Sequence, residues 1–112
     1  MTELLKETLK KIHNYNKSQI EIRPYCRERM KERNIEEDLL ISTLFSDSLY
    51  YIEEQLKKFM GEPEKRDKLI FKISSKYSLI IIVVFHEKIL KVINVIKTSK
   101  GVEKKWRKEI SK

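Results

Sequence analysis

The stretch that most constrains the fold runs from Lys76 to Lys100, KYSLIIIVVFHEKILKVINVIKTSK. Two runs rich in β-branched residues flank the polar tripeptide HEK, and a connection this short joins antiparallel neighbours. Residues Leu79–Phe85 are apolar at every position, which is typical of a central strand covered on both faces. Seven residues are also far fewer than the roughly 20 that a membrane-spanning helix needs. The stretch therefore predicts a hairpin at the centre of a sheet.

Further strands are predicted on the N-terminal side of this hairpin. The segment LYYIEEQLKKF is ambiguous, because Ile52, Leu56 and Phe59 have helical spacing, whereas its first residues have strand composition. We favour a strand at its start. The segment GEPEKRD, Gly61–Asp67, carries one of two glycines and one of two prolines and predicts a loop. The predicted strands are Ser18–Arg23 as a short extended segment, Leu49–Glu53, Lys68–Ser74, Tyr77–Phe85 and Lys88–Thr98.

Helices are predicted at both ends of the chain. Thr2 is a suitable N-cap for an amphipathic helix that ends near Asn14–Asn16, and Pro24 suits the first turn of a second helix. The predicted helices after the first are Pro24–Arg33, Glu36–Phe45 and a basic one at Val102–Ile110. The order predicts a single α+β domain over residues 1–112. Its N-terminal helices would pack on an antiparallel meander of about four strands, followed by a short C-terminal basic helix.

Cysteine use and the N-terminus point to a cytoplasmic protein. Cys26 is the only cysteine of the 112 residues, so no internal disulfide can form, and a reducing compartment is expected. The first residues, MTELLKETLKKIHNY, are charged and lack the apolar core and cleavage site of a signal peptide. We therefore expect a soluble cytoplasmic domain that does not associate with membranes.

Positive charge gathers in the second half of the chain. Residues 1–60 hold 11 basic and 11 acidic side chains, whereas residues 61–112 hold 14 basic and 6 acidic ones, which accounts for the net charge of +8. Such a basic region attracts polyanions by releasing their counterions. A solvated lysine-rich surface is the alternative interpretation. Nucleic acid is the binding partner that we expect, with contacts from Lys72, Lys97, Lys100, Lys104, Trp106 and Arg107.

The side chains that could carry chemistry are basic and aromatic. His13 and His86 lie far apart in the sequence with no carboxylate at ligand spacing to both, so no metal site or cofactor is expected. Cys26 has arginines nearby that could activate its thiol, but a buried helix residue is the favoured interpretation. RNA supplies its own nucleophile, the 2′-hydroxyl. Arginines could therefore stabilise charge on the phosphate while a tyrosine or histidine moves a proton; the candidate catalytic residues are Tyr25, Arg29, Arg33 and His86.

Two segments together resemble the small RelE/ParE-superfamily domains, including BrnT-like and related uncharacterised ones. The first, IEIRPYCRERMKERNIEEDLLISTLF, matches an opening pattern of a strand followed by His-Ala-x-x-Arg-Met-x-x-Arg-x-Ile at Arg29, Met30, Arg33 and Ile35. The second matches the closing hairpin of these domains at Val92, Val95, Thr98, Ser99 and Lys100. The two segments cover about half of the chain.

The resemblance implies a RelE-like fold and an origin in toxin–antitoxin pairs. That superfamily includes metal-independent endoribonucleases, some of which act on ribosome-associated RNA, and members with other targets. Three positions depart from its pattern, because Tyr25 stands at the usual His, Cys26 at the following Ala, and Asn94 at the usual Thr. Tyrosine can donate a proton but is a poor base at neutral pH, since its ordinary pKa is about 10. The fold is thus implied more firmly than the reaction.

Three functional hypotheses follow from the sequence. The leading one is a RelE-like toxin or toxin-derived domain that binds RNA and cleaves it without a metal. The second is a non-catalytic interaction module whose basic surface binds an acidic antitoxin-like partner or a second copy of the chain as a homodimer. The third is an orphan domain of unknown function whose charge only keeps it in solution.

Overall fold

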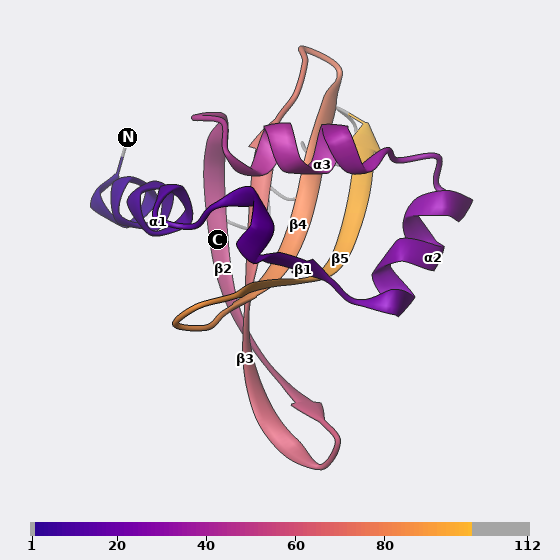
Figure 1. The fold of residues 1–112 in the computed structure, drawn as a ribbon. Helices are drawn as coiled ribbons and strands as arrows, with labels where there is room; N and C mark the ends of the chain where they lie inside the picture. Colours follow the sequence, from indigo (N-terminus) through magenta and orange to yellow (C-terminus); the bar gives the residue numbers. More distant parts are fainter. Residues whose placement is uncertain (1, 100–112) are drawn as a thin grey trace, which may run out of the picture.

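The computed structural model describes residues 2–99 and has an α+β fold. Its helices pack beside one mixed sheet of five strands (Figure 1). The helices are α1 (Glu3–His13), α2 (Pro24–Glu32) and α3 (Glu37–Leu44), with a short 3-10 turn at Lys17–Gln19. The strands are β1 (Ile20–Ile22), β2 (Leu49–Phe59), β3 (Glu62–Lys72), β4 (Tyr77–Phe85) and β5 (Leu90–Ser99). The predicted C-terminal helix, Val102–Ile110, and the predicted contact residues Lys100, Lys104, Trp106 and Arg107 lie outside the described residues.

The sheet has the strand order β1-β5-β4-β3-β2. Strands β2 to β5 form the predicted antiparallel meander, and β4 lies at its centre as expected. The prediction of a purely antiparallel sheet of about four strands is wrong, because β1 pairs in parallel with the first half of β5, from Ile20 opposite Leu90 to Ile22 opposite Val92. This pairing satisfies backbone groups of β5 that would otherwise lie at the sheet edge.

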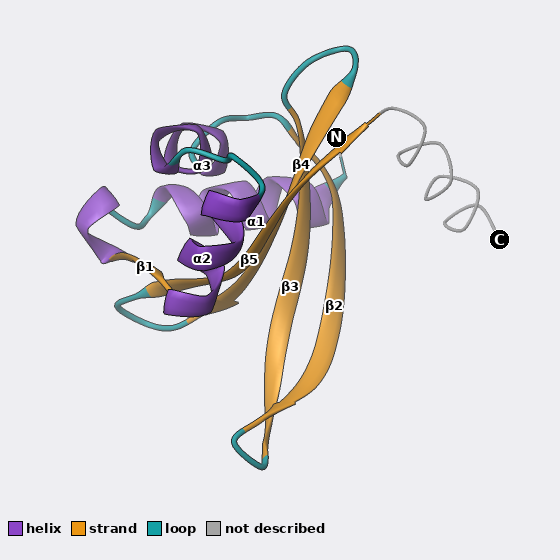
Figure 2. Ribbon diagram, turned by 90° about the vertical axis from the view of Figure 1, so that its right-hand side faces the viewer, coloured by secondary structure: helices purple, strands orange, loops and turns teal. Residues whose placement is uncertain are grey.

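All three helices lie on one face of the sheet (Figure 2). The N-cap hydroxyl of Thr2 accepts a hydrogen bond from the Leu5 backbone N–H at 3.3 Å, and Pro24 occupies the first turn of α2. The helices and the sheet share one core. Its fully buried members include Ile12, Leu40, Leu44, Leu69, Phe71, Leu79, Ile81, Val83, Leu90, Val92 and Val95.

The segment predicted as a loop, Gly61–Asp67, is mostly strand. Its residues from Glu62 onward belong to β3, which pairs with β2 down to Phe59 opposite Glu62. The connection is therefore the two residues Met60 and Gly61, both with positive φ (53° and 83°), which is the geometry of a tight hairpin turn. The predicted strand at the start of β2 is confirmed, but it continues through Phe59.

A β-bulge divides β5 into two halves that differ in side-chain direction. The pairing with β4 passes from Ile82 opposite Asn94 directly to Val83 opposite Val92, so Ile93 is the extra residue. Simple alternation places Lys91 and Lys97 on the same face. Instead Lys97 pairs with Leu79 of the helix-covered face, whereas Lys91 pairs with Val84 on the opposite face.

No helix among residues 2–99 is long and apolar enough to cross a membrane.

Candidate nucleic-acid interface

Helix α2 presents a row of aromatic and basic side chains. Tyr25, Arg29 and Arg33 follow one another at intervals of four residues, so they lie along one side of the helix. The Arg29 Nε donates a hydrogen bond to the Tyr25 hydroxyl at 2.8 Å, and its guanidinium lies 5.0 Å from the Tyr25 ring centroid. Its Nη1 donates to Glu32 at 3.2 Å. The structure thus brings Tyr25 and Arg29 together, with the arginine charge partly balanced by a carboxylate.

Arg33 joins the end of α2 to the edge of β5. It is the C-cap residue of the helix, and its Nη1 donates to the Asn94 Oδ1 at 3.0 Å and to the Val95 carbonyl at 2.9 Å. The Asn94 side chain also accepts from the Val95 N–H at 2.9 Å. Strand β1 pairs with β5 only as far as Val92, so the later edge of β5 is open to Arg33. Both partners of Arg33 are neutral, so its positive charge is not cancelled there.

An open cavity of about 470 Å³ lies beside this edge. Arg33, Tyr77, Ile96, Lys97 and Thr98 line it. The Lys97 Nζ lies 4.8 Å from the Tyr77 ring centroid, and the tyrosine is 43% exposed. Within residues 2–99, no carboxylate forms an ion pair with either Arg33 or Lys97. Two unneutralised cations and an exposed ring therefore meet at one end of the sheet; we call Arg33, Tyr77 and Lys97 the β5-edge cluster.

Lys72 lies at the same end of the sheet as this cluster but on the other face. It is exposed, and it pairs with Ser78, which in turn pairs with Thr98. These three residues share the face opposite to Lys97. Contact of one nucleic acid strand with both Lys72 and Lys97 would therefore have to pass around the sheet edge.

His86 lies at the opposite end of β4 from Tyr77. Eight residues of β4 lie between them, so nine steps of an extended strand span about 30 Å. Arg33 lines a cavity with Tyr77, so the imidazole cannot act together with Arg33 on one phosphate. Arg33 and His86 therefore do not lie together in the single site that the sequence suggested.

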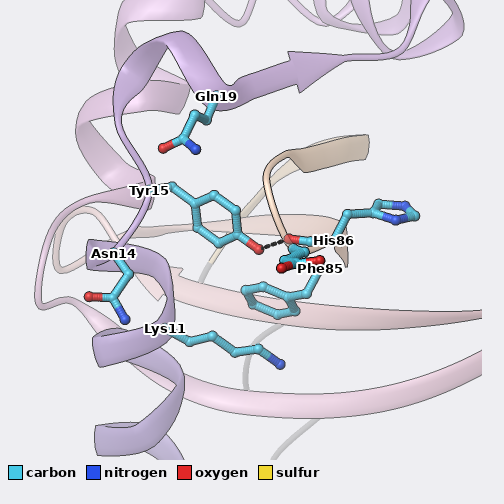
Figure 3. A pocket seen from close by; sticks show the side chains of 7 residues that line it. Lys11, Asn14, Tyr15, Gln19, Phe85 and His86 are labelled. Carbon is cyan, nitrogen blue, oxygen red and sulfur yellow. Dashed lines mark hydrogen bonds between the residues drawn. The ribbon is translucent and has the colours of Figure 1, made fainter.

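A second cavity, of about 350 Å³, surrounds the His86 backbone (Figure 3). The Tyr15 hydroxyl donates a hydrogen bond to the His86 carbonyl, while the imidazole points away from Tyr15. Burial raises the pKa of Tyr15, which keeps the phenol a neutral donor. The Lys11 Nζ lies 4.3 Å from the Phe85 ring centroid at the cavity wall. These contacts connect α1 and the residues after it to the β4–β5 turn. They stabilise the fold, so this cavity needs no ligand to explain its residues.

Cys26 is a core residue. It is fully buried, and burial raises the pKa of its thiol to about 11, although Arg33 and Arg27 lower it. A thiol of this kind stays protonated at neutral pH and is a poor nucleophile.

Among residues 2–99, no group of three His, Cys, Asp or Glu side chains has the arrangement of a metal site.

One half-buried ionic cluster was not anticipated from the sequence. Glu64 on β3 accepts hydrogen bonds from Arg23 Nη1 and Nη2 at 3.2 and 2.8 Å and from Arg66 Nε at 2.9 Å. Arg23 follows β1, so the cluster joins two strands that are not neighbours in the sheet and requires the sheet to coil. No local sequence signal pairs residues 41 positions apart; only the strand register brings them together.

Comparisons of the chain with protein-family models, with characterised proteins and with solved structures give no match. The resemblance to RelE-like domains therefore stays a prediction from the sequence. Any functional assignment depends on the chemistry of the β5-edge cluster and its surroundings.

Proposed function

We propose that this chain is a RelE-like toxin or toxin-derived domain that binds single-stranded RNA along the open edge of β5. The observation that carries the proposal is the β5-edge cluster, in which Arg33 and Lys97 have no carboxylate partner among residues 2–99 and Tyr77 is exposed beside them. Cations left without carboxylate partners beside a cavity suit an anionic ligand.

Phosphate groups are the anions that fit this surface best. The Arg33 guanidinium is held by two hydrogen bonds from Nη1, so its remaining N–H donors point from a fixed position. Lys97, on β5 itself, adds a second positive charge beside the same cavity. Successive phosphates of a nucleic acid could therefore bind Arg33 and Lys97 in turn, and the net charge of +8 would favour encounter.

The exposed aromatic rings favour a single strand over a duplex. Tyr77 beside Lys97 and Tyr25 beside Arg29 each combine a flat ring with a cation. Unpaired bases stack on such rings while the neighbouring phosphate binds the cation. Bases within a duplex are already stacked on each other and are not available for this contact.

Cleavage, if it accompanies binding, would be carried by α2 rather than by His86. Attack of the 2′-oxygen on the adjacent phosphorus expels the 5′-oxygen, so a base must take one proton and an acid must supply another. The Tyr25 hydroxyl accepts a hydrogen bond from Arg29 and keeps its own proton for donation, which suits the acid. Glu32, which accepts a hydrogen bond from Arg29 at 3.2 Å, is a carboxylate with the chemistry of a base.

Binding can be tested by fluorescence anisotropy with a labelled single-stranded RNA over a range of salt concentrations. The variant Arg33→Ala/Lys97→Ala removes two charges from the cluster, and Lys10→Ala/Lys17→Ala removes two exposed charges elsewhere. We expect the cluster variant to bind much more weakly. The slope of log K against log salt should fall by about 1.4, because each lost phosphate contact on a single strand contributes about 0.7.

The matched control variant separates a site from general charge. Equal weakening by both double variants would contradict the proposal, as would the absence of RNA binding by the wild type. A preference for an acidic peptide over RNA at equal salt would favour the interaction-module hypothesis instead. Incubation of the same RNA in EDTA with the wild type and with Arg29→Ala/Arg33→Ala tests cleavage; equal survival of the RNA would exclude the nuclease activity.

A further inference from the structure

Strand β2 has an outer edge that no described strand covers. It is the last strand in the sheet order, and its ladder with β3 runs over its whole length. Strand β4 pairs only with Asp67–Lys72 of β3. The part of the β2–β3 hairpin nearest its turn, residues 55–66, therefore extends past the rest of the sheet (Figures 1 and 2). An exposed edge of this length is a template for pairing with another strand.

Exposed apolar side chains accompany this edge. Leu56 is 74% exposed in the middle of the projecting strand, and Met60 at the turn is 88% exposed. Leu4 of α1 is 56% exposed and lines one cavity with Ile52, also of β2. Ile52 and Leu56 share the helix-covered face of the strand, because Ile52 pairs with core residue Leu69 and Leu56 is four positions further on. Exposed apolar side chains thus stand on one face of this edge, with Glu54 between Ile52 and Leu56.

The charges of β2 are arranged in opposite order on the two sides of Leu56. Two acids, Glu53 and Glu54, precede it, and two lysines, Lys57 and Lys58, follow it. A parallel in-register partner would place acid against acid. An antiparallel copy centred on Leu56 would place Glu54 against Lys58 on both sides of the centre. The strand is therefore complementary in charge to itself.

We propose that two copies of this chain associate through antiparallel pairing of their β2 strands, with Leu56 facing Leu56 on the two-fold axis. In this register Glu54 faces Lys58 of the second copy, and Ile52 and Leu4 meet the turn that carries its Met60. A two-fold antiparallel pair requires one residue to face its own copy. The neighbouring register, centred on Gln55, would instead place Leu56 against the Glu54 carboxylate.

The surroundings of Glu54 support this partner. Glu54 forms an exposed ion pair with Lys65 at 3.0 Å and lies directly opposite Asp67. The pKa of Asp67 is raised chiefly by burial and further by Glu54, while Lys65 and Lys11 lower it. An additional lysine from the second copy would reduce the repulsion between these two carboxylates. The proposal does not depend on RNA binding, because the β5-edge cluster lies at the other side of the sheet.

The register can be tested by oxidative cross-linking of the full chain. We expect Leu56→Cys to form a disulfide-linked dimer, since facing residues of an antiparallel pair bring their Cβ atoms within about 5 Å. Gln55→Cys is the matched control one position away and should not cross-link. The wild type is a suitable background because Cys26 is fully buried. Efficient cross-linking of Gln55→Cys but not of Leu56→Cys would overturn the register.

The charge pairing can be tested by the molar mass of the protein in light scattering over a range of concentrations. Lys58→Glu and Glu54→Lys each place like charges in two symmetric contacts and should raise the dimer dissociation constant about tenfold. The double variant Glu54→Lys/Lys58→Glu should return it toward the wild-type value, which a general loss of folding would not do. A wild type that is monomeric at all concentrations, or a double variant weaker than both single ones, would overturn the proposal.

Discussion

At the scale of single residues, Glu64 is a carboxylate held by two arginines. It accepts three hydrogen bonds from Arg23 and Arg66, and the side chains of all three residues are less than one fifth exposed. The hydrogen bond from Arg23 is the main reason that the pKa of Glu64 lies below its ordinary value of 4.5, with further lowering by Arg66 against the effect of burial. The carboxylate is therefore favoured in the folded state.

This arrangement predicts a pH-dependent contribution to stability. Because the folded pKa is lowered, the contribution is present above pH 4.5 and is lost as the pH falls through the folded value. Glu64→Gln should lower the free energy of unfolding at pH 7 by about 1.5–3 kcal/mol, as for a charge-assisted hydrogen bond. Below the folded pKa the variant and the wild type should converge. Denaturant unfolding at several pH values measures this difference.

Glu62→Gln is the control for this prediction. Glu62 is exposed on the same strand and should change stability little at any pH. An unfolding free energy for Glu64→Gln that stays below that of the wild type by the same amount at acidic pH would show that the cost is steric rather than ionic.

At the scale of the elements, the sequence predicted the helices better than the β2–β3 hairpin. Caps and apolar spacing give the bounds of α1, α2 and α3 to within a few residues, because these signals are local. The hairpin turn is Met60-Gly61 rather than the usual Asn-Gly, and Pro63 follows it, so its sequence is typical of a loop. Pro63 is tolerated because β3 has only one neighbour at that position.

The turn itself supplies an element-scale prediction. Met60 has a φ of 53°, a left-handed conformation that strains most residues other than glycine. Asparagine tolerates this conformation better, because its short polar side chain can form local hydrogen bonds. Met60→Asn should therefore raise the free energy of unfolding by about 0.5–1 kcal/mol. Gly61 has a φ of 83°, and nothing lies within 4 Å of a Cβ added there. Gly61→Ala should therefore lower the free energy of unfolding by about 1 kcal/mol, through backbone strain and not through a steric clash.

Denaturant unfolding of both variants at a protein concentration below dimer formation checks these signs. Stabilisation by Gly61→Ala would mean that the turn does not have the left-handed geometry described. Destabilisation by Met60→Asn would mean that the methionine side chain contributes more than its backbone strain costs.

The candidate site was predicted in part, for reasons that also belong to the elements. Arg29, Arg33 and Lys97 were expected from charge and resemblance, and the sheet brings the last two together at one cavity. His86 was assigned to the same site because the sequence does not tell which end of the β4–β5 hairpin lies beside Arg33. The bulge at Ile93 likewise could not be anticipated, since a bulged isoleucine is the same residue type as its neighbours in a regular strand.

At the scale of the whole molecule, the sheet separates two surfaces. The β5-edge cluster and the β2 edge lie on opposite sides of the central strand in the order β1-β5-β4-β3-β2. Pairing through β2 would produce one continuous sheet with the proposed RNA-binding edge toward each end. Each copy would then offer its Arg33, Tyr77 and Lys97 without obstruction by the other.

This separation predicts that dimer formation and RNA binding are independent. Substitutions at distant sites with no shared partners have additive effects on free energy. Leu56→Ser, which leaves the charge unchanged, should weaken the dimer without altering the affinity for an RNA short enough to occupy one site. Arg33→Ala/Lys97→Ala should do the reverse, and the triple variant should show both losses unchanged. Light scattering and anisotropy on the same four proteins measure the two equilibria. A loss of short-RNA affinity in Leu56→Ser would mean instead that one RNA contacts both copies, and that the RNA-binding surface extends across the dimer.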